Sequence, residues 1–344
     1  MKICFIQLVI VMMVVLHLPI LADQEYIDAP FEQEVHVPFS IAEGEANDVK
    51  TICVDSHGNV WAGTHAGVFL LKNDEQQWTA LMSEAELGSV YDIISDSQDD
   101  IWIGAWSGVY RASGAGLVKI EGISEPVAAL CDAESMTAFG PTGMWQFESN
   151  WNKRSLKSSR AIRSALPDGN GGFWLATGMG LYRVIEDQWR LFQSTDELLT
   201  PALEDITFAE NGDLWVAGFG GVSILRNQLL IKTISPKDGL PSSLVHCVER
   251  APDGVMWIGT KQGIARIHDG QSSVRHSRRW LLDDDVRDIA FDADGAAWIA
   301  TAKGVSAIKK KKVTLVQKDA YFRSVCLARH QREPGLVERC FLAT

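Results

Sequence analysis

Tryptophan recurs at a nearly fixed interval along this 344-residue chain, each time inside the same local pattern. A glycine follows each of these tryptophans by six residues, and a small residue follows it by two. The six positions are Trp61, Trp102, Trp174, Trp215, Trp257 and Trp298. Their spacings are 41, 72, 41, 42 and 41 residues, so the chain is built from a repeat with one copy hidden in the double gap.

The hidden copy is the segment CDAESMTAFGPTGMW, which has Thr137 at the tryptophan position and Gly143 at the glycine position. The chain therefore holds seven units. A period near 41 residues, with short apolar runs between turn residues, is typical of β-propellers with one four-stranded blade per unit. We therefore expect an all-β fold, a seven-bladed β-propeller of antiparallel blades.

The strands of one unit can be recognised from their composition. A first strand such as VKTICV leads into a D-x-x-G type turn, which favours a tight hairpin. The second strand, such as VWAGT, is apolar at successive positions, as required of a sheet that is covered on both faces. The small residue two positions after the tryptophan leaves room for the neighbouring blade. Because no blade can bury both faces alone, the whole ring is the folding unit.

The repeat pattern V-x-x-I-x-x-D-x-x-G-x-x-W-I-G-T-x-x-G-V resembles the two-component regulator propeller repeat. The resemblance covers residues 48 to about 322, and six of the seven copies match well. It implies a periplasmic ligand-sensing domain of the kind that often precedes a histidine kinase. No kinase, receiver or second membrane segment follows the repeats here, so we expect signalling to need a separate partner, such as a membrane sensor kinase, or a further C-terminal part.

The two ends of the chain differ from the repeats. Residues 1–22 read as a secretory signal peptide, with Lys2 before a long apolar run and Ala22 before a polar break; an uncleaved membrane anchor is the alternative. Residues 23–47 form an N-terminal segment that could supply a closing strand, residues 48–322 the propeller, and residues 323–344 a C-terminal hairpin or a truncated eighth repeat. We therefore expect an exported protein, periplasmic or extracellular, with no membrane span after cleavage of the signal.

Charge and cysteine content exclude several classes of function. The net charge of −12 argues against a nucleic-acid partner and against docking on anionic membranes. The six cysteines show no C-x-x-C spacing, so a zinc site is not expected, and a disulfide between Cys326 and Cys340 stays open as one alternative. Motifs for metalloproteases, serine hydrolases, dinucleotides and phosphates are absent from the sequence. We accordingly predict no catalytic residue, no metal and no cofactor.

Three aspartates, Asp92, Asp205 and Asp288, each lie ten residues before a repeat tryptophan, where the chain enters the first strand of a blade. A carboxylate at this position could accept hydrogen bonds from backbone amides between blades. Alternatively, the three could form a ring of carboxylates at the mouth of the central channel.

The loops that differ most between repeats follow the second strands and precede the first strands, on the face where propellers usually bind ligands. Aromatic side chains beside cations suit a carbohydrate, including an acidic one, because rings stack on sugars and guanidinium binds carboxylate. The candidate ligand-binding residues are His65, Tyr91, Trp106, Arg163, Phe219, His246, Lys261, Arg287 and Lys303.

Three functions fit the sequence. The first is a non-catalytic sensor that binds a small molecule or oligosaccharide. The second is a scaffold that binds another protein, which would need an exposed apolar patch. The third is an enzyme, since streptogramin lyases are similar seven-bladed propellers with a histidine base and a divalent metal. His246 with Asp205 or Asp288 could mimic that arrangement, although no His-x-Glu or His-x-His pair is present.

Overall fold

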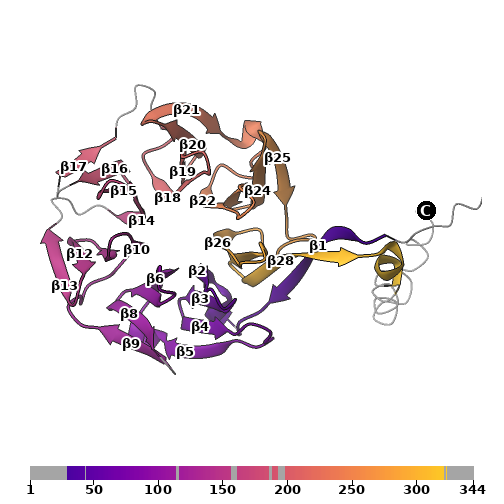
Figure 1. Cartoon of the computed structure of the whole chain (residues 1–344), viewed down its shortest axis with the longest axis horizontal. Helices are drawn as coiled ribbons and strands as arrows, with labels where there is room; N and C mark the ends of the chain where they lie inside the picture. Colours follow the sequence, from indigo (N-terminus) through magenta and orange to yellow (C-terminus); the bar gives the residue numbers. More distant parts are fainter. Residues whose placement is uncertain are drawn as a thin grey trace, which may run out of the picture. The chain divides into compact units, whose positions relative to one another are not determined.

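The computed structural model describes residues 29–42, 44–113, 116–155, 161–185, 188–192, 198–320 and 323. The chain divides into two units, one of residues 34–310 and one of the end segments 1–33 and 311–344. Residues 34–310 form a ring of seven four-stranded antiparallel sheets, which confirms the predicted seven-bladed propeller (Figure 1). The predicted signal peptide, the C-terminal hairpin or eighth repeat, and the pair Cys326 and Cys340 lie outside the described residues.

The first four blades follow each other along the chain, and strand order in each sheet is the sequence order. Blade 1 contains β2 (Val49–Val54), β3 (Val60–Thr64), β4 (Gly67–Leu71) and β5 (Thr79–Ser83). Blade 2 contains β6 (Val90–Ser95), β7 (Ile101–Ala105), β8 (Gly108–Ser113) and β9 (Gly116–Ile120). Blade 3 contains β10 (Ala129–Asp132), β11 (Met136–Phe139), β12 (Gly143–Phe147) and β13 (Trp151–Ser155). Blade 4 contains β14 (Ile162–Pro167), β15 (Phe173–Thr177), β16 (Gly180–Ile185) and β17 (Gln188–Leu191).

The remaining blades repeat this arrangement until the last one. Blade 5 contains β18 (Leu203–Phe208), β19 (Leu214–Gly218), β20 (Gly221–Arg226) and β21 (Leu229–Ile234). Blade 6 contains β22 (Val245–Arg250), β23 (Met256–Thr260), β24 (Gly263–His268) and β25 (Gln271–Arg275). Blade 7 contains β26 (Val286–Phe291), β27 (Ala297–Thr301), β28 (Gly304–Val313) and β1 (Phe31–Phe39). Three short helices lie between strands, namely η1 (Gly44–Asn47), α2 (Glu84–Leu87) and η2 (Pro236–Asp238).

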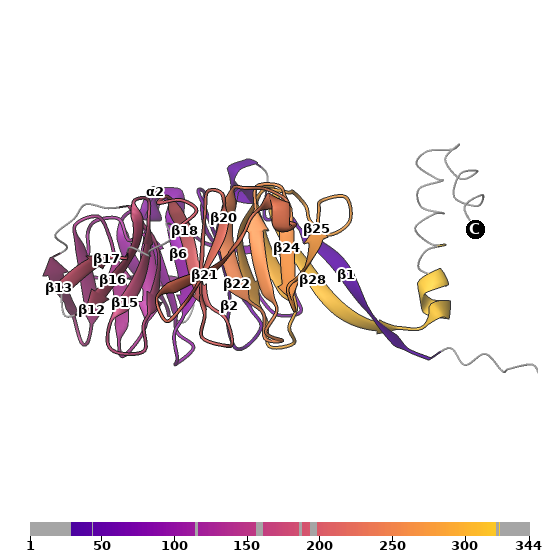
Figure 2. The ribbon, with the colours of Figure 1, turned by 90° about the horizontal axis from the view of Figure 1, so that it is seen from above.

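Blade 7 is assembled from both ends of the propeller sequence. Its sheet order is β1-β28-β27-β26, so the outermost strand comes from before blade 1 and the other three come from the last repeat. Figure 2 shows β1 running beside β28. Phe39 of β1 packs against the repeat tryptophan of this blade, Trp298, with ring centroids 5.3 Å apart. Hydrogen bonds within one sheet therefore close the ring.

A second contact ties β1 to the neighbouring blade. The carboxylate of Glu34 in β1 lies 2.6 Å from Nη1 of Arg266 in β24 and 2.8 Å from Nη2 of Arg275 in β25. Burial favours the neutral form of Glu34, but the hydrogen bonds and charges of the two arginines outweigh it and lower the pKa of Glu34 below its ordinary value. The charged carboxylate thus joins blade 7 to blade 6.

The blades pack closely because the second strand carries a small residue two positions after the tryptophan. A Cβ atom added at Gly63 would lie 2.6 Å from Cγ1 of Val90 in the next blade, and one added at Gly259 would lie 2.7 Å from Cγ1 of Val286. Both distances are too short for real contacts. A larger residue at either position would therefore push two blades apart.

The degenerate repeat forms a complete blade without a tryptophan on its second strand. Thr137 occupies that position and pairs with Cys131 and Gln146 in the neighbouring strands. The repeat tryptophan of a blade faces the following blade, and in the core between blades 3 and 4 this side is filled by Phe139 and Met144 of blade 3. Trp145 and Trp151 pack on the other face, in the core shared with blade 2. Substitution of the tryptophan is therefore compatible with the fold, because other side chains of the same blade fill the core.

We predict that Glu34→Gln destabilises the propeller by about 2 kcal/mol, since hydrogen bonds to charged groups contribute about 1.5–3 kcal/mol. Two partly buried guanidinium groups lose their carboxylate in this variant. Because the pKa of Glu34 is lowered in the folded state, the difference in unfolding free energy between wild type and variant should be complete above the unfolded pKa of 4.5. It should disappear as the pH falls through the folded pKa. Urea unfolding monitored by tryptophan fluorescence measures it.

The exposed Glu121 provides the matched control, and Glu121→Gln should unfold like the wild type. Equal midpoints for Glu34→Gln and the wild type at pH 7 would show that the ion pairs add nothing to closure.

Candidate functional site

A β-bulge recurs at the same place on the inner strand of six blades. In blade 2, for example, Val90 pairs with Ala105 and Asp92 pairs with Gly104, so Tyr91 between them is the extra residue. A bulged residue leaves the pairing register, which re-aims its side chain. The six bulged residues are Lys50, Tyr91, Arg163, Glu204, His246 and Arg287. Each stands 11 residues before its repeat tryptophan.

These bulged residues line one cavity of about 600 Å³. Blade 3, which lacks the bulge, contributes Ala128 from its entrance and Gly140 and Pro141 from the loop after its second strand. Every blade therefore contributes to the same cavity, which must lie at one end of the ring axis. In size it falls within the range of small-molecule sites.

Two aromatic side chains give the cavity stacking surfaces. Trp106, in the loop after the second strand of blade 2, is 59% exposed, and Tyr91 is 40% exposed. The backbone N–H of Trp106 donates to the carbonyl of Ser89 at 2.9 Å. Gly88, with φ of 69°, lies against the indole, and a Cβ there would come within 2.6 Å of Trp106 Cβ. The backbone thus fixes the position of an indole that remains accessible to a ligand.

Charged side chains line other parts of the same cavity. The buried carboxylate of Asp285 lies 2.8 Å from Nη2 of Arg287, 3.4 Å from Nε2 of His246, and against Nζ of Lys261. Burial, followed by the charge of Arg287, lowers the pKa of His246, so its imidazole is neutral at pH 7. On the opposite side of the ring, Nε of Arg163 lies 3.6 Å from the carboxylate of Glu204.

Arg287 keeps one donor unused. Its Nε is buried and makes no hydrogen bond to any described residue, although Nη2 is held by Asp285. A buried donor without a partner costs free energy that a bound acceptor can recover. Arg287 lines the cavity together with His246.

The structure brings together five of the nine predicted ligand-binding residues. Tyr91, Trp106, Arg163, His246 and Arg287 all line the cavity. The other four lie outside its lining, and these are His65, Phe219, Lys261 and Lys303.

The four outlying residues have other surroundings. Nδ1 of His65 lies 3.2 Å from the hydroxyl of Ser89, and Nζ of Lys303 pairs with Asp283 at 2.6 Å. Phe219 is 58% exposed in its loop. Nζ of Lys261 lies against the carboxylate of Asp285.

Lys50 and Glu204 were missed by the sequence reasoning, although both line the cavity. Variation between loops does not single them out. The signal that could have found them is the register, since both stand 11 residues before a repeat tryptophan, as do four of the predicted residues.

The three predicted channel carboxylates each accept a hydrogen bond from the inner strand of the next blade. Asp92 accepts from the backbone N–H of Leu130 at 2.7 Å, Asp205 from that of Val248 at 2.9 Å, and Asp288 from that of Ile52 at 2.8 Å. These bonds join blades 2 to 3, 5 to 6 and 7 to 1 around the axis. Each carboxylate is therefore part of the contact between blades.

Burial raises the pKa of each of these carboxylates, to about 7 for Asp92 and Asp205 and about 6 for Asp288. The charge of Asp288 raises the pKa of the other two further. Burial, and then the charges of Asp205 and Asp288, raise the pKa of Glu249 to about 8. The interior of the ring below the cavity thus holds carboxyl groups that are partly protonated near neutral pH.

Within the described part of the chain, no cluster of three or more histidine, cysteine, aspartate or glutamate side chains has the arrangement of a metal site. His246 contacts Asp285, whereas Asp205 and Asp288 bind backbone amides. In the same described residues, no helix has the length and apolar character needed to cross a membrane.

The sequence profile described as two component regulator propeller matches residues 44–66 and 239–262, which are the starts of blades 1 and 6. The resemblance found in the repeat pattern is therefore confirmed. No curated protein shows significant sequence similarity to the chain.

Solved structures with the same fold include three proteins of different activity. The extracellular domain of a hybrid two-component system from B. thetaiotaomicron shares 14% identity with a TM-score of 0.66 over 80% of this chain and 40% of that one. Virginiamycin B lyase from Staphylococcus aureus shares 11% identity with a TM-score of 0.64 over 82% of this chain and all of the lyase. PorZ, a surface component of the type-IX secretion system of Porphyromonas gingivalis, shares 15% identity with a TM-score of 0.60 over 76% of this chain and 46% of PorZ.

At these identities the likeness concerns the fold alone. The chain spans less than half the length of the sensor domain and of PorZ.

We predict that Asp205→Asn changes the pH dependence of stability in a defined direction. The folded pKa of about 7 exceeds the unfolded value of 3.8, so between these values the folded protein holds a proton that the unfolded chain has lost. The stability contributed by Asp205 therefore falls as the pH rises toward 7. Relative to the variant, the wild type should gain more than about 1 kcal/mol between pH 8 and pH 5, because one pKa unit corresponds to about 1.4 kcal/mol.

Urea unfolding of both proteins at the two pH values tests this difference. The exposed Asp269 supplies a matched control in Asp269→Asn, for which no change is expected. Parallel pH profiles for the wild type and Asp205→Asn would contradict the raised pKa.

Proposed function

We propose that this chain, which carries repeats of the two-component regulator propeller, is a non-catalytic sensor that binds an acidic oligosaccharide in the cavity at the ring axis. The observation that supports the proposal most directly is the ring of bulged residues. It places Tyr91, Arg163 and Arg287 in one cavity with the exposed indole of Trp106. Aromatic faces stack on sugar rings, and guanidinium groups bind carboxylates.

The charges of the ring favour an anion over a neutral sugar. Lys50, Arg163 and Arg287 carry positive charge, and Glu204 is the one acidic residue among the six bulged positions. Each of these three cations lies beside one carboxylate, that of Asp48, Glu204 or Asp285, and Lys261 beside Asp285 leaves one positive charge in excess.

A signalling role rests on the likeness to a sensor domain. The B. thetaiotaomicron domain of the same fold is extracellular and belongs to a hybrid two-component system. We propose a comparable location outside the cytoplasm for this chain, with a membrane sensor kinase as its partner. All seven blades line the cavity, so a ligand bound there can change how the blades pack against one another. A partner that contacts the propeller would respond to this change.

We predict that uronic-acid oligosaccharides raise the melting temperature of the protein, whereas glucose oligomers of equal length do not. Trp106→Ala should weaken binding of the acidic ligand about tenfold, corresponding to about 1.4 kcal/mol. Arg287→Lys should weaken it by a similar factor, because lysine cannot form the two-pronged contact of a guanidinium group. Calorimetric titration of each variant measures both effects.

The chain offers matched controls on the same face. Phe219 is as exposed as Trp106 but lies outside the cavity, so Phe219→Ala should leave the affinity unchanged. Lys303→Ala plays the same role for the cations. Loss of binding in these two variants but not in Trp106→Ala would show that the ligand does not bind in the cavity at the axis.

The same titrations discriminate the other candidate functions. A stabilising shift with divalent metal alone would favour the lyase-like enzyme, since streptogramin lyase adopts this fold. The absence of any shift with sugars or metals would favour a protein partner.

A further inference from the structure

The aspartate six residues before the repeat tryptophan has a defined partner in three blades. There the indole N–H of the tryptophan donates to the aspartate carboxylate, at 2.7 to 3.1 Å. The same carboxylate also accepts backbone N–H groups of the hairpin turn. The pairs are Trp61 with Asp55, Trp102 with Asp96, and Trp298 with Asp292.

Blade 4 shows how an arginine can use the same carboxylate. Asp168 again stands six residues before Trp174, and it accepts hydrogen bonds from Nε of Arg183 at 2.9 Å and Nη2 at 2.7 Å. Arg183 pairs with Trp174 across β15 and β16, and its guanidinium carbon lies 5.5 Å from the indole centroid. The carboxylate at this repeat position therefore accepts from the indole in three blades and from a guanidinium group in blade 4.

Blade 6 retains both donors but has no carboxylate at this position. Ala251 replaces the aspartate, six residues before Trp257. Trp257 is only 4% exposed, and its Nε1 makes no hydrogen bond to a described residue. Arg266 pairs with Trp257 as Arg183 pairs with Trp174, and its guanidinium carbon lies 4.7 Å from the indole centroid. Its Nε is also buried and without a partner in the described chain.

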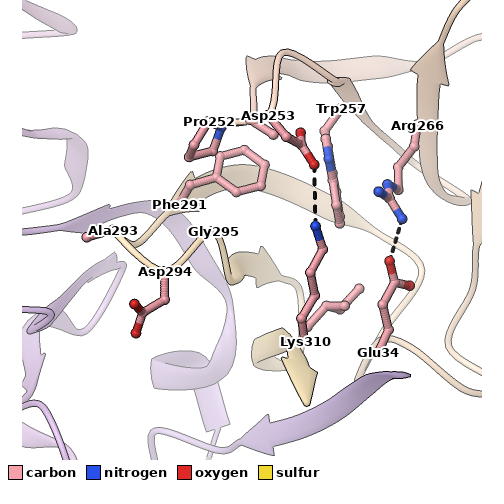
Figure 3. Close-up of a pocket in the computed structure, with 12 residues that line it drawn as sticks. Glu34, Pro252, Asp253, Trp257, Arg266, Phe291, Ala293, Asp294, Gly295 and Lys310 are labelled. Atoms are coloured by element: carbon pink, nitrogen blue, oxygen red, sulfur yellow. Dashed lines mark hydrogen bonds and ion pairs between the residues drawn. The ribbon is translucent and has the colours of Figure 1, made fainter. Parts of the chain in front are cut away.

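A cavity of about 290 Å³ is lined by Trp257 and Arg266, the residues that carry these two donors (Figure 3). Ala251, Phe291 and Ile308 give it apolar walls. A water molecule takes about 30 Å³ of the liquid, so the cavity has room for a carboxylate with a short apolar group attached. Figure 3 shows Trp257 between the ion pair of Arg266 with Glu34 and that of Lys310 with Asp253.

The charges around the cavity permit an anion. Glu34 is neutralised by two arginines, Arg266 and Arg275, which leaves one positive charge in that group. Lys310 lies 3.5 Å from Asp253, so this pair is neutral in sum. Asp294 is exposed and therefore well solvated.

We propose that this cavity binds a carboxylate group in place of the aspartate that blade 6 lacks, with the indole N–H of Trp257 and the Nε–H of Arg266 as its donors. The carboxylate belongs either to a short free organic acid or to the aspartyl side chain of a peptide. The site is separate from the cavity at the ring axis and does not depend on the function proposed for that cavity.

The first test uses the full chain labelled with ¹⁵N on tryptophan and titrated with sodium propionate. We expect the indole N–H resonance of Trp257, assigned through Trp257→Phe, to move downfield with saturation. The melting temperature should rise at the same time. Sodium chloride at equal ionic strength and propionamide serve as controls and should leave the resonance in place. An unmoved Trp257 resonance in the wild-type protein would overturn the proposal.

The second test builds the missing carboxylate into the chain. Ala251→Asp should raise the melting temperature by about 2 °C, since about 1 kcal/mol shifts a domain of this size by 2–4 °C, and it should abolish the response to propionate. The matched control is Ala209→Asp in blade 5, where Ile224 instead of an arginine stands opposite Trp215 and the nearby Arg226 is held by Asp213. That variant should retain the propionate response. An unchanged response in Ala251→Asp would contradict the assignment.

Two peptides distinguish the sources of the carboxylate. Acetyl-Gly-Asp-Gly-amide that saturates the Trp257 shift at a tenfold lower concentration than propionate would identify a peptide side chain. Weaker or equal binding would identify a free acid. Acetyl-Gly-Asn-Gly-amide should not bind in either case.

Discussion

Closure of the ring by β1 is the constraint on which the other features depend. Both faces of a blade are apolar, so each blade is stable only between two neighbours, and the first and last repeats must meet. In this chain they meet inside one sheet, where β1 pairs with β28, and Glu34 carries the contact into blade 6. The axial cavity exists only in the closed ring, because each blade contributes to its wall. The binding proposed for the axis would therefore be coupled to the stability of the fold.

The repeat supplies a common framework, and the blades acquire individual roles by departing from it. The aspartates at the inner strands show this well, since three blades use a carboxylate and the equivalent position in blade 6 is Cys247. The carboxylates accept hydrogen bonds from backbone amides of adjacent blades, but the charge of Asp288 also raises the pKa of Asp92 and Asp205. Seven such carboxylates would repel one another strongly in the narrow interior. Their restriction to three blades keeps the hydrogen bonds and limits the repulsion.

Much of the fold could be predicted from the sequence, whereas only part of the site could. The tryptophan period, the glycine six residues later and the degenerate copy at Thr137 are local patterns, and they led to the correct number of blades. The site depends on where a side chain points, which is decided by a bulge of one residue. Loop variation identified Trp106 and Arg287 but also Phe219, which lies outside the cavity, and it passed over Lys50. Pairing register is a property of two strands, so no single segment could reveal it.

The bulges also make the identity of a side chain independent of the pairing between strands, although the two are usually linked in a β-sheet. A residue within a ladder is constrained by the partner opposite it, whereas a bulged residue has no such partner. The six bulged positions hold lysine, tyrosine, glutamate, histidine and two arginines on almost identical strands. Each position can therefore change its side chain without altering the sheet behind it. A propeller of this type can acquire a new specificity by single substitutions, one blade at a time, while its scaffold stays the same.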